Sequence, residues 1–342
     1  MKPGNTIILA TVVVLILITI AMVLGGKTMV FLTLTVAGVA VASADFLSSG
    51  PTVYSEPLPP VLGGGGRLKR KTVRRTLFGQ LRHNSTAMKR TLKFIRGRNR
   101  DFFPVAKPIL LHGPPGDAAT LNQLREAWLK DFADSKVDPT GRASSRVKYL
   151  DPYLAGIRAS LSQWPDYKFI DIGASEGTIT AAIANELGLD AEHAVALDIV
   201  EQPGGDAVTF ARTDGQTIPF PDKEFDLLTM LMSAHHFSDV KAMFAEAARI
   251  AKPGARLIIR EHGKTDKSSV LFYDAAHALY ESVYSDETPP EEFAARYARG
   301  KFAEYRTIDE WVDIATAAGF QLRVKSEPRE DKFDTVFAMF VR

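Results

Sequence analysis

The chain has 342 residues, of which 46% are apolar and 24% are charged. These fractions are typical of a folded protein and exclude intrinsic disorder as the default expectation. The sequence contains no cysteine, which excludes disulfide bonds, thiolate nucleophiles and cysteine-ligated zinc. Any chemistry must therefore come from oxygen and nitrogen groups, and the sequence motifs assign no metal site.

The net charge of +2 conceals a strong asymmetry along the chain. Residues 67–100 contain 13 Lys or Arg and no acidic residue. Residues 101–342 contain 27 basic and 38 acidic residues, which gives a net charge of −11. A basic segment therefore precedes an acidic domain.

Two apolar stretches, Ile7–Leu24 and Met29–Leu47, open the chain with 18 and 19 residues. Each is close to the ~20 residues that a helix needs to cross a ~30 Å hydrocarbon core. We expect residues 1–47 to form a transmembrane helical hairpin, with a single long span as an alternative. A signal peptide cleaved at Ala42-Ser43-Ala44 is a further alternative, although its apolar region would far exceed the usual length of roughly 7–15 residues.

The segment after the apolar stretches divides into a linker and a tether. Residues 48–66 are rich in Gly, Pro and Ser, which is typical of a flexible linker. Residues 67–100 form a basic tether, and because Lys and Arg concentrate on the cytoplasmic flank of membrane spans, we expect the large domain to be cytosolic.

Anionic lipid headgroups are the expected partner of the basic tether, at about 1 kcal/mol per basic residue near a membrane surface. Its interleaved apolar residues favour helices that lie in the membrane interface. These residues are Leu77, Phe78, Leu81, Leu92, Phe94 and Ile95. RNA binding is one alternative, because phosphate contacts need little more than clustered cations, and a solvated linker is the other.

The remaining chain predicts an α/β fold. Residues 101–145 form a connecting segment with a helix at Asn122–Phe132, and a second helix at Arg146–Gln163 opens the last domain. From Lys168 onward, apolar runs of strand length alternate with helix-length segments, which predicts a mostly parallel sheet covered on both faces. The expected strands are Lys168–Ile172, Ala194–Asp198, Val208–Ala211, Phe225–Met232, Arg256–Glu261, Gln321–Ser326 and Thr335–Val341. The expected helices between them are Gly177–Leu187, Val240–Ile250, Ser269–Tyr284 and Ile308–Ala318.

The strongest motif follows the first strand, which contains Asp171 and leads into Gly173-Ala174-Ser175-Glu176-Gly177. A turn without bulky side chains lets a ligand approach the helix N-terminus and the carboxyl edge of the strand. The second strand ends at Asp198, whose carboxylate can accept both hydroxyls of a ribose. Asp214-Gly215 follows the third strand. Acids at three successive strand ends predict a nucleoside site.

These motifs resemble those of the class I S-adenosylmethionine-dependent methyltransferase superfamily, and in particular a domain of the methyltransferase 11 type. The resemblance covers the chain from about Arg146 to Arg342. The resemblance implies a seven-stranded Rossmann-like sheet with a reversed last strand and S-adenosylmethionine as the cofactor. The implied cofactor-binding residues are Asp171, Gly173, Ser175, Gly177, Asp198, Ile199, Asp214, Gly215 and Met232. Ser175 stands where the family usually has glycine.

Two other functions compete with a methyltransferase. Gly173–Gly177 also fits G-x-S-x-G, the nucleophile elbow of serine hydrolases, with Ser175 as the nucleophile. Hydrolases of that fold have several strands before the elbow, and the segment upstream predicts none. A catalytically inert methyltransferase-like domain that serves as a membrane scaffold or structural subunit is the other alternative. A dinucleotide site is disfavoured, because the G-x-G-x-x-G spacing is absent.

Methyl transfer is an in-line displacement that depends mainly on positioning. Where the acceptor must lose a proton, the candidate bases are His235 and His236 after the fourth strand and Glu261 at the end of the fifth. The insertion Ser269–Arg306 would cover the acceptor, and its aromatic stripe at helical spacing is more typical of a core than of a binding surface. The acceptor stays open between a lipid, a quinone, a protein and RNA, and the sequence assigns no oligomeric state.

Overall fold

The computed structural model describes residues 76–132, 139–159, 161, 166–200, 207–285, 288–300, 302–329 and 333–342. The expected transmembrane hairpin at 1–47, the linker at 48–66 and the first part of the basic tether lie outside the described residues. Within the part of the chain that is described, no helix is long and apolar enough to cross a membrane.

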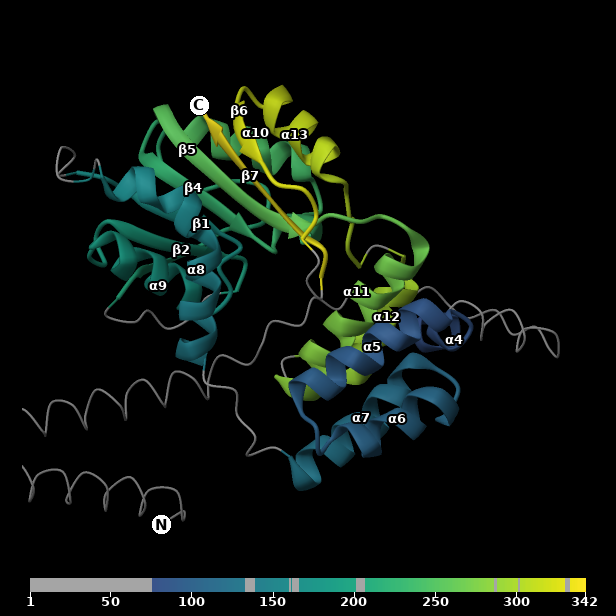
Figure 1. The fold of residues 1–342 in the computed structure, drawn as a ribbon. Helices are drawn as coiled ribbons and strands as arrows, with labels where there is room; N and C mark the ends of the chain where they lie inside the picture. The colour runs from purple at the N-terminus through teal and green to yellow at the C-terminus, as the bar shows by residue number, and fades with distance from the viewer. Residues whose placement is uncertain are drawn as a thin grey trace, which may run out of the picture. The chain divides into compact units, whose positions relative to one another are not determined.

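A seven-stranded sheet with the order β3-β2-β1-β4-β5-β7-β6 forms the centre of the C-terminal domain (Figure 1). Its strands are β1 (Phe169–Ile172), β2 (Ala194–Asp198), β3 (Thr209–Arg212), β4 (Phe225–Leu231), β5 (Ala251–His262), β6 (Gln321–Lys325) and β7 (Thr335–Val341). The first five strands pair in parallel, whereas β7 is antiparallel to both β5 and β6. The predicted α/β fold with a reversed last strand is confirmed.

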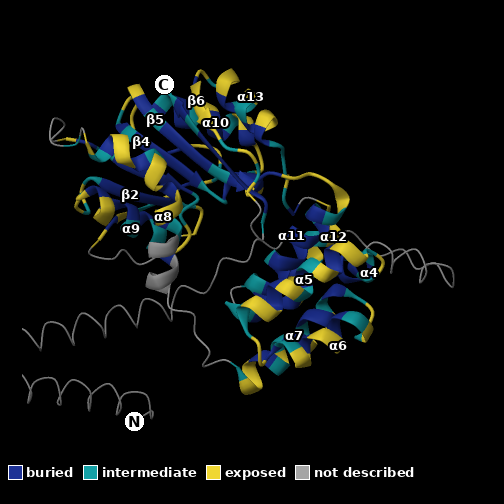
Figure 2. Ribbon diagram, viewed as in Figure 1, coloured by how far each residue is buried: buried dark blue, intermediate teal, exposed yellow. Residues whose placement is uncertain are grey.

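Helices cover both faces of the sheet, because successive residues of a buried strand point to opposite sides. In β5, Leu257 and Ile259 join the core beneath α10 (Val240–Ile250) and α13 (Ile308–Ala317). Ile258 joins the core on the other face, beneath α8 (Pro139–Arg158) and α9 (Thr178–Leu187). Figure 2 shows the buried strands between exposed outer helix surfaces.

A separate group of helices, here called the helical cluster, combines two distant segments of the chain. The first segment supplies α4 (Leu77–Arg82), α5 (Ser85–Arg98), α6 (Phe103–His112) and α7 (Asp117–Asp131). The second lies between β5 and α13 and supplies α11 (Lys267–Leu279), a π-helical turn (Tyr280–Tyr284) and α12 (Pro290–Ala298). Because α11 packs on α4 and α5, and α12 packs on α7, the two segments share one core.

The apolar residues of the basic tether belong to this core, which differs from the interfacial position expected for them. Leu77, Phe78, Leu81, Phe94 and Ile95 are buried, and Leu92 packs against them. They pack against α11, which carries the aromatic stripe predicted for the insertion Ser269–Arg306. Phe272 and Tyr273 of this stripe are buried in the same core. The interpretation of that stripe as core is confirmed for these two residues.

Candidate active site

The loop after β1 has left-handed backbone at Gly173, Ser175 and Gly177, with φ values of 78°, 51° and 68°. A Cβ at Gly177 would lie 2.6 Å from Cζ of Phe210, and one at Gly173 would overlap Ser233. The two glycines are therefore required both by conformation and by the close approach of side chains on β3 and just after β4. Ser175 is exposed, so its side chain meets no such obstacle.

Asp198 lies at the end of β2 and is bonded to this loop. Its Oδ2 accepts a 2.7 Å hydrogen bond from the Ser175 backbone N–H, and its Oδ1 accepts one of 2.7 Å from Ile199 N–H. Val200 N–H also donates to Oδ1, at 3.3 Å. A carboxylate has about four acceptor positions, so the remaining one lies on Oδ2 and can take a ligand hydroxyl. Ile199 and Val200 are 59% and 56% exposed and present apolar surface beside the carboxylate.

Asp171 has a different position from the one expected, because its side chain is buried within the domain. Its two oxygens accept hydrogen bonds from Thr180 Oγ1 at 2.7 Å and Thr229 Oγ1 at 2.6 Å. Burial raises the pKa of Asp171 to about 6, against the lowering effect of the two threonines. Asp171 thus braces α9 and β4 against β1 beneath the loop.

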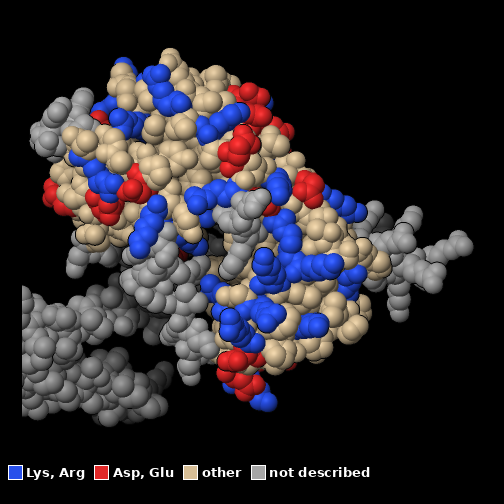
Figure 3. Space-filling view, in the orientation of Figure 1, with Lys and Arg blue, Asp and Glu red and all other residues tan. Residues whose placement is uncertain are grey.

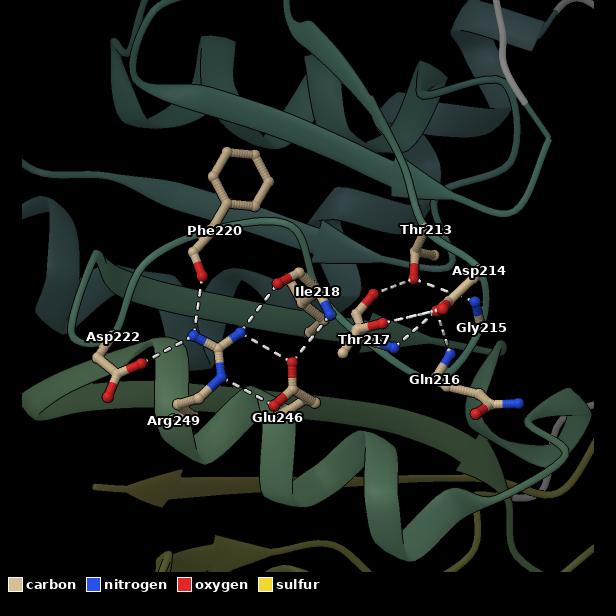
Figure 4. A network of polar contacts seen from close by, with 10 residues as sticks. All are labelled: Thr213, Asp214, Gly215, Gln216, Thr217, Ile218, Phe220, Asp222, Glu246 and Arg249. Atoms are coloured by element: carbon tan, nitrogen blue, oxygen red, sulfur yellow. Dashed lines mark hydrogen bonds and ion pairs between the residues drawn. The ribbon is translucent and has the colours of Figure 1, made fainter.

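Asp214 organises the turn after β3, as Figure 4 shows. Its Oδ1 accepts from the backbone N–H groups of Gln216 at 2.8 Å and Thr217 at 2.7 Å. These bonds, that of Thr217 first, hold the pKa of Asp214 below its usual value. The turn lies beside the β2 tip, because a Cβ at Gly215 would be 3.5 Å from Ile199 Cγ2. Asp214 and Gly215 are thereby brought next to Ile199.

Arg249 on α10 clamps the segment that follows this turn, a role that the sequence did not reveal (Figure 4). Its guanidinium donates to the carbonyl oxygens of Ile218 at 2.9 Å and Phe220 at 2.8 Å. It also donates to the carboxylates of Glu246 and Asp222. Glu246 Oε2 in turn accepts from Ile218 N–H at 2.9 Å. The Arg249–Glu246 ion pair therefore binds both the N–H and the carbonyl of Ile218.

The chain bends sharply where β4 ends. Met232 has a φ of 65°, and its N–H donates to the carbonyl of Arg260 on β5 at 2.7 Å. Ser233 Oγ then donates to the carbonyl of Ile172 at 2.7 Å. These contacts join the ends of β1, β4 and β5, so that Ser233, the residue after Met232, lies against Gly173.

Two of the predicted catalytic residues contact each other just beyond this bend. His235 Nδ1 is 2.5 Å from Glu261 Oε2, and Ala234 N–H donates to Glu261 Oε1 at 2.8 Å. The exposed fractions of His235 and Glu261 are 1% and 0%. Burial raises the pKa of Glu261 to about 7 and lowers that of His235 well below its usual range. The pair is therefore shielded from solvent.

His236, the third predicted catalytic residue, is exposed. Its ring centre lies 4.2 Å from that of His235 and 5.6 Å from that of Phe302. Glu304 N–H donates to the carbonyl of His235 at 2.8 Å, so the segment before α13 packs on the β4 turn. The insertion thus reaches the ends of β4 and β5, where we expected it to cover the acceptor.

Comparison with known families assigns the sheet and its loops. Residues 170–259 match a family model described as a methyltransferase domain, and this match spans β1 to β5. The chain contains a class I methyltransferase domain. The methyltransferase domain thus includes the glycine loop, the β2 tip with Asp198, the Asp214 turn and the β4 bend.

Three relatives show how far the similarity extends. The chain is 29% identical over 154 residues to the uncharacterized methyltransferase YcgJ of Bacillus subtilis, which covers 43% of this chain and 60% of YcgJ. It is 27% identical over 173 residues to the ubiquinone/menaquinone biosynthesis C-methyltransferase UbiE of Cupriavidus metallidurans, covering 48% and 67%. It is 36% identical over 100 residues to a probable tocopherol O-methyltransferase of Oryza sativa, covering 26% and 27%. The chain thus spans two thirds or less of the length of these relatives.

The serine hydrolase alternative has no support in the methyltransferase domain. Ser175 Oγ donates to Glu176 Oε2 at 2.7 Å, and no histidine among the described residues contacts Ser175. A nucleophile elbow requires an adjacent base to activate its serine. Within the described part of the chain, β1 is also the first strand, so the sheet lacks the preceding strands that a hydrolase of that fold needs.

Proposed function

We propose that the chain is a membrane-anchored, S-adenosylmethionine-dependent methyltransferase with a lipid-soluble aromatic acceptor of the quinol class. The observation that carries the proposal is the bond between Asp198 and the Ser175 backbone, which joins a side-chain-poor loop to a carboxylate at the carboxyl edge of the sheet. Parallel α/β sheets bind nucleoside ligands at this edge.

The residues around Asp198 fit the proposed cofactor. The remaining acceptor position on Asp198 Oδ2 suits a ribose hydroxyl, and the exposed Ile199 gives apolar surface for the purine. Gly215 leaves room beside Ile199, and the turn formed by Asp214 fixes that edge. Gly173 and Gly177 would let the methionine part approach the backbone. S-adenosylmethionine supplies the methyl group when bound.

His236 is the best placed of the predicted bases to remove a proton from an acceptor. It is exposed at the end of β4, whereas His235 and Glu261 are buried against each other. Methyl transfer itself needs alignment and exclusion of water more than proton transfer. We infer that His235 and Glu261 position the turn that carries His236.

The acceptor class follows from two kinds of support. The name of one relative refers to ubiquinone/menaquinone biosynthesis, and the name of another is that of a probable tocopherol O-methyltransferase. Aromatic rings also gather around the β4 turn, where Tyr305 stacks on His235 at 5.4 Å and Phe302 contacts His236. Such rings suit a planar, apolar acceptor.

Anchoring at the cytosolic face of a membrane is part of the proposal. It is supported by the apolar stretches Ile7–Leu24 and Met29–Leu47 and by the basic tether that follows them. On α5, Lys89, Lys93 and Arg96 are exposed, and Figure 3 shows Lys and Arg gathered over the helical cluster. Cations at this position would favour an anionic lipid surface.

The decisive experiment supplies labelled S-adenosylmethionine to the full-length chain with extracted lipids, total protein and total RNA in parallel. We expect label in a reduced-quinone fraction of the lipids. Label confined to RNA or protein would contradict the acceptor class. Cofactor binding without any turnover would instead support the inert scaffold.

The membrane anchor has its own test. We expect the full-length chain to stay with membranes after an alkaline wash, and a chain that lacks residues 1–47 to be released. Release of the full-length chain would contradict the anchor. Protease should cut the large domain in inside-out vesicles and spare it in right-side-out vesicles.

A further inference from the structure

Four of the chain's seven histidines gather where β4, β5 and α11 meet. His235 follows β4, His262 is the last residue of β5, and His277 lies on α11. One ring nitrogen of each of these three residues lies within 4.8 Å of the corresponding nitrogens of the other two. His235 and His262 are each 1% exposed, so their nitrogens must find partners inside the protein.

The Nδ1 atom of each ring already has a partner. His262 Nδ1 is 3.2 Å from the Phe333 carbonyl and His277 Nδ1 is 2.9 Å from the Tyr273 carbonyl. Because a carbonyl only accepts, both Nδ1 atoms carry hydrogen and both Nε2 atoms present lone pairs. His235 Nδ1 faces the Glu261 carboxylate at 2.5 Å. Metal-bound histidines have this arrangement, in which the other ring N–H donates to a carbonyl or carboxylate.

The three Nε2 atoms lie close together, but the rings carry too few N–H groups for all three Nε2 atoms to be hydrogen-bonded. His235 Nε2 and His277 Nε2 are 3.4 Å apart, and His262 Nε2 is buried with no hydrogen-bond partner. Two imidazole nitrogens on one tetrahedral zinc ion, at bond lengths of ~2.0–2.1 Å, lie about 3.3–3.4 Å apart. The separation of His235 and His277 has this value.

A hydrogen-bonded alternative explains less of the geometry. If Glu261 were protonated and donated to His235 Nδ1, His235 Nε2–H could donate to His277 Nε2. That arrangement would satisfy two imidazoles and leave His262 Nε2 buried without a partner, which is unfavourable for a polar atom. A cation would offer a partner to all three nitrogens, which lie within 4.8 Å of one another.

We propose that His235, His262 and His277 bind one divalent transition-metal ion of the zinc type through their Nε2 atoms. Neutral imidazoles suit Zn²⁺, Co²⁺, Ni²⁺ and Cu²⁺, whereas Mg²⁺ and Ca²⁺ prefer oxygen ligands. Three histidines leave a fourth position for water or an acceptor oxygen. The site adds a ligand class beyond the methyl donor, and its existence does not depend on methyl transfer.

The test measures metal binding by the full-length chain, purified without a histidine tag and stripped with a chelator. Zn²⁺ titration calorimetry and elemental analysis should give one tightly bound ion per chain. The Co²⁺-loaded chain should show visible absorption bands of a four- or five-coordinate site. Binding of S-adenosylmethionine to the stripped chain, measured separately, tests the proposed function on its own. A wild-type chain that binds no stoichiometric Zn²⁺ or Co²⁺ overturns the metal site.

Variants locate the ion. His262→Gln and His277→Gln should each weaken Zn²⁺ binding at least about 100-fold. Glu261→Gln keeps all three histidines and replaces the carboxylate that faces His235 Nδ1, and should weaken it about 10- to 100-fold. His193→Gln is the matched control, because His193 bonds to Asp190 outside the cluster, and should bind as the wild type does. Circular dichroism establishes that each variant is folded. Wild-type affinity and Co²⁺ bands in a folded His262→Gln chain would refute the assignment.

Discussion

The carboxyl edge of the sheet has two halves with opposite chemistry. On the β1–β3 side, an exposed Asp214, a half-buried Asp198 and backbone N–H groups form the proposed cofactor site. On the β4–β5 side, His235, Glu261 and His262 are buried beneath α11. The first half keeps acceptor capacity for a ligand, whereas the second must satisfy its polar groups from within the protein or with an ion.

The pKa shifts follow the same division. Hydrogen bonds from its own turn hold the pKa of Asp214 below its usual value, so this carboxylate is charged at neutral pH. Burial raises the pKa of Glu261 to about 7 and that of Asp274, in the helical cluster, to about 7 as well. Substitutions on the two sides should therefore differ in their effects on binding and on pH dependence.

The largest effect is expected on the cofactor side, at Gly177. Gly177 and Gly188 both have a φ of 68°, but a Cβ would lie 2.6 Å from the Phe210 ring at Gly177 and meets nothing within 4 Å at Gly188. Gly188→Ala should therefore lower the unfolding free energy only through the strain of alanine in left-handed backbone, by about 1–2 kcal/mol. Gly177→Ala adds overpacking of about 1–3 kcal/mol.

Cofactor titrations separate the two glycine variants. We expect Gly177→Ala to weaken S-adenosylmethionine binding more than 100-fold, because the loop must move away from Phe210. Gly188→Ala should bind with the affinity of the wild type. Equal affinities for the two variants would show that the loop adapts without loss, and the cofactor site would then need another location.

A smaller loss is expected at Asp198. Asp198→Ala removes both the ribose acceptor and the bond to the Ser175 N–H, and should weaken S-adenosylmethionine binding more than tenfold, or about 1.4 kcal/mol. Asp190 is a matched control, since it is exposed and accepts N–H bonds in the turn before β2. Calorimetry on Asp190→Ala should give the wild-type affinity, and unchanged binding by Asp198→Ala would contradict the ribose contact.

These two halves also differ in how well the sequence predicted them. The loop after β1 and Asp198 follow strands with clear apolar runs, so their shared edge could be predicted from the alternation of strands and helices alone. The same reasoning predicts that Asp171 contacts the ligand, but its position within β1 lets Thr180 and Thr229 enclose its side chain. The pattern of apolar residues in a strand predicts that a residue lies near the carboxyl edge of the sheet. The side chains around that residue determine whether its own side chain faces the ligand or the core.

The histidine side could not be predicted in this way. His235, His262 and His277 come from β4, β5 and α11, with no fixed sequence spacing that signals a common site. Their meeting depends on α11 packing against α5, whose apolar residues the sequence predicts at a membrane surface. The tether has the composition of a helix that lies in a membrane interface. Only the complementary apolar face on α11 shows that these residues belong to the core of the helical cluster instead.

Arg249 offers a test of intermediate size on the cofactor side. Arg249→Ala removes the guanidinium bonds to the Ile218 and Phe220 carbonyls and leaves Glu246 without its cation. We expect a loss of about 2 kcal/mol in unfolding free energy and roughly fivefold weaker cofactor binding, or about 1 kcal/mol, because the segment after Asp214 loosens. Arg158, whose partners Asp151 and Glu186 are exposed, is the control.

Urea unfolding distinguishes the two arginines. Exposed ion pairs contribute about 0–1 kcal/mol, so Arg158→Ala should change the unfolding free energy by less than half as much as Arg249→Ala. Equal losses would mean that the bonds to Ile218 and Phe220 contribute nothing beyond a surface pair. The Asp214 turn would then hold its position without the clamp on α10.

The smallest effect concerns pH and belongs to the buried half. Burial raises the pKa of Asp274 to about 7, even though Tyr305 Oη donates to its Oδ1 at 2.9 Å. An unfolded Asp has a pKa of about 3.9, so between about pH 4 and 7 the folded state binds more protons than the unfolded state. The unfolding free energy should therefore fall as the pH rises through this window.

Asp274→Asn isolates this contribution, because an amide keeps the acceptor for Tyr305 and has no charge to bury. We expect the variant to lose less unfolding free energy than the wild type between about pH 4 and 7, although Glu261 and Asp171 act in the same direction. Asp190→Asn is the control, since the pKa of Asp190 is lowered by His193 and its effect lies below this window. Urea titrations at several pH values measure both slopes. If Asp274→Asn has the same slope of unfolding free energy against pH as the wild type, the proton taken up on folding binds to another group. Glu261, beside the histidines, would then be the next residue to replace.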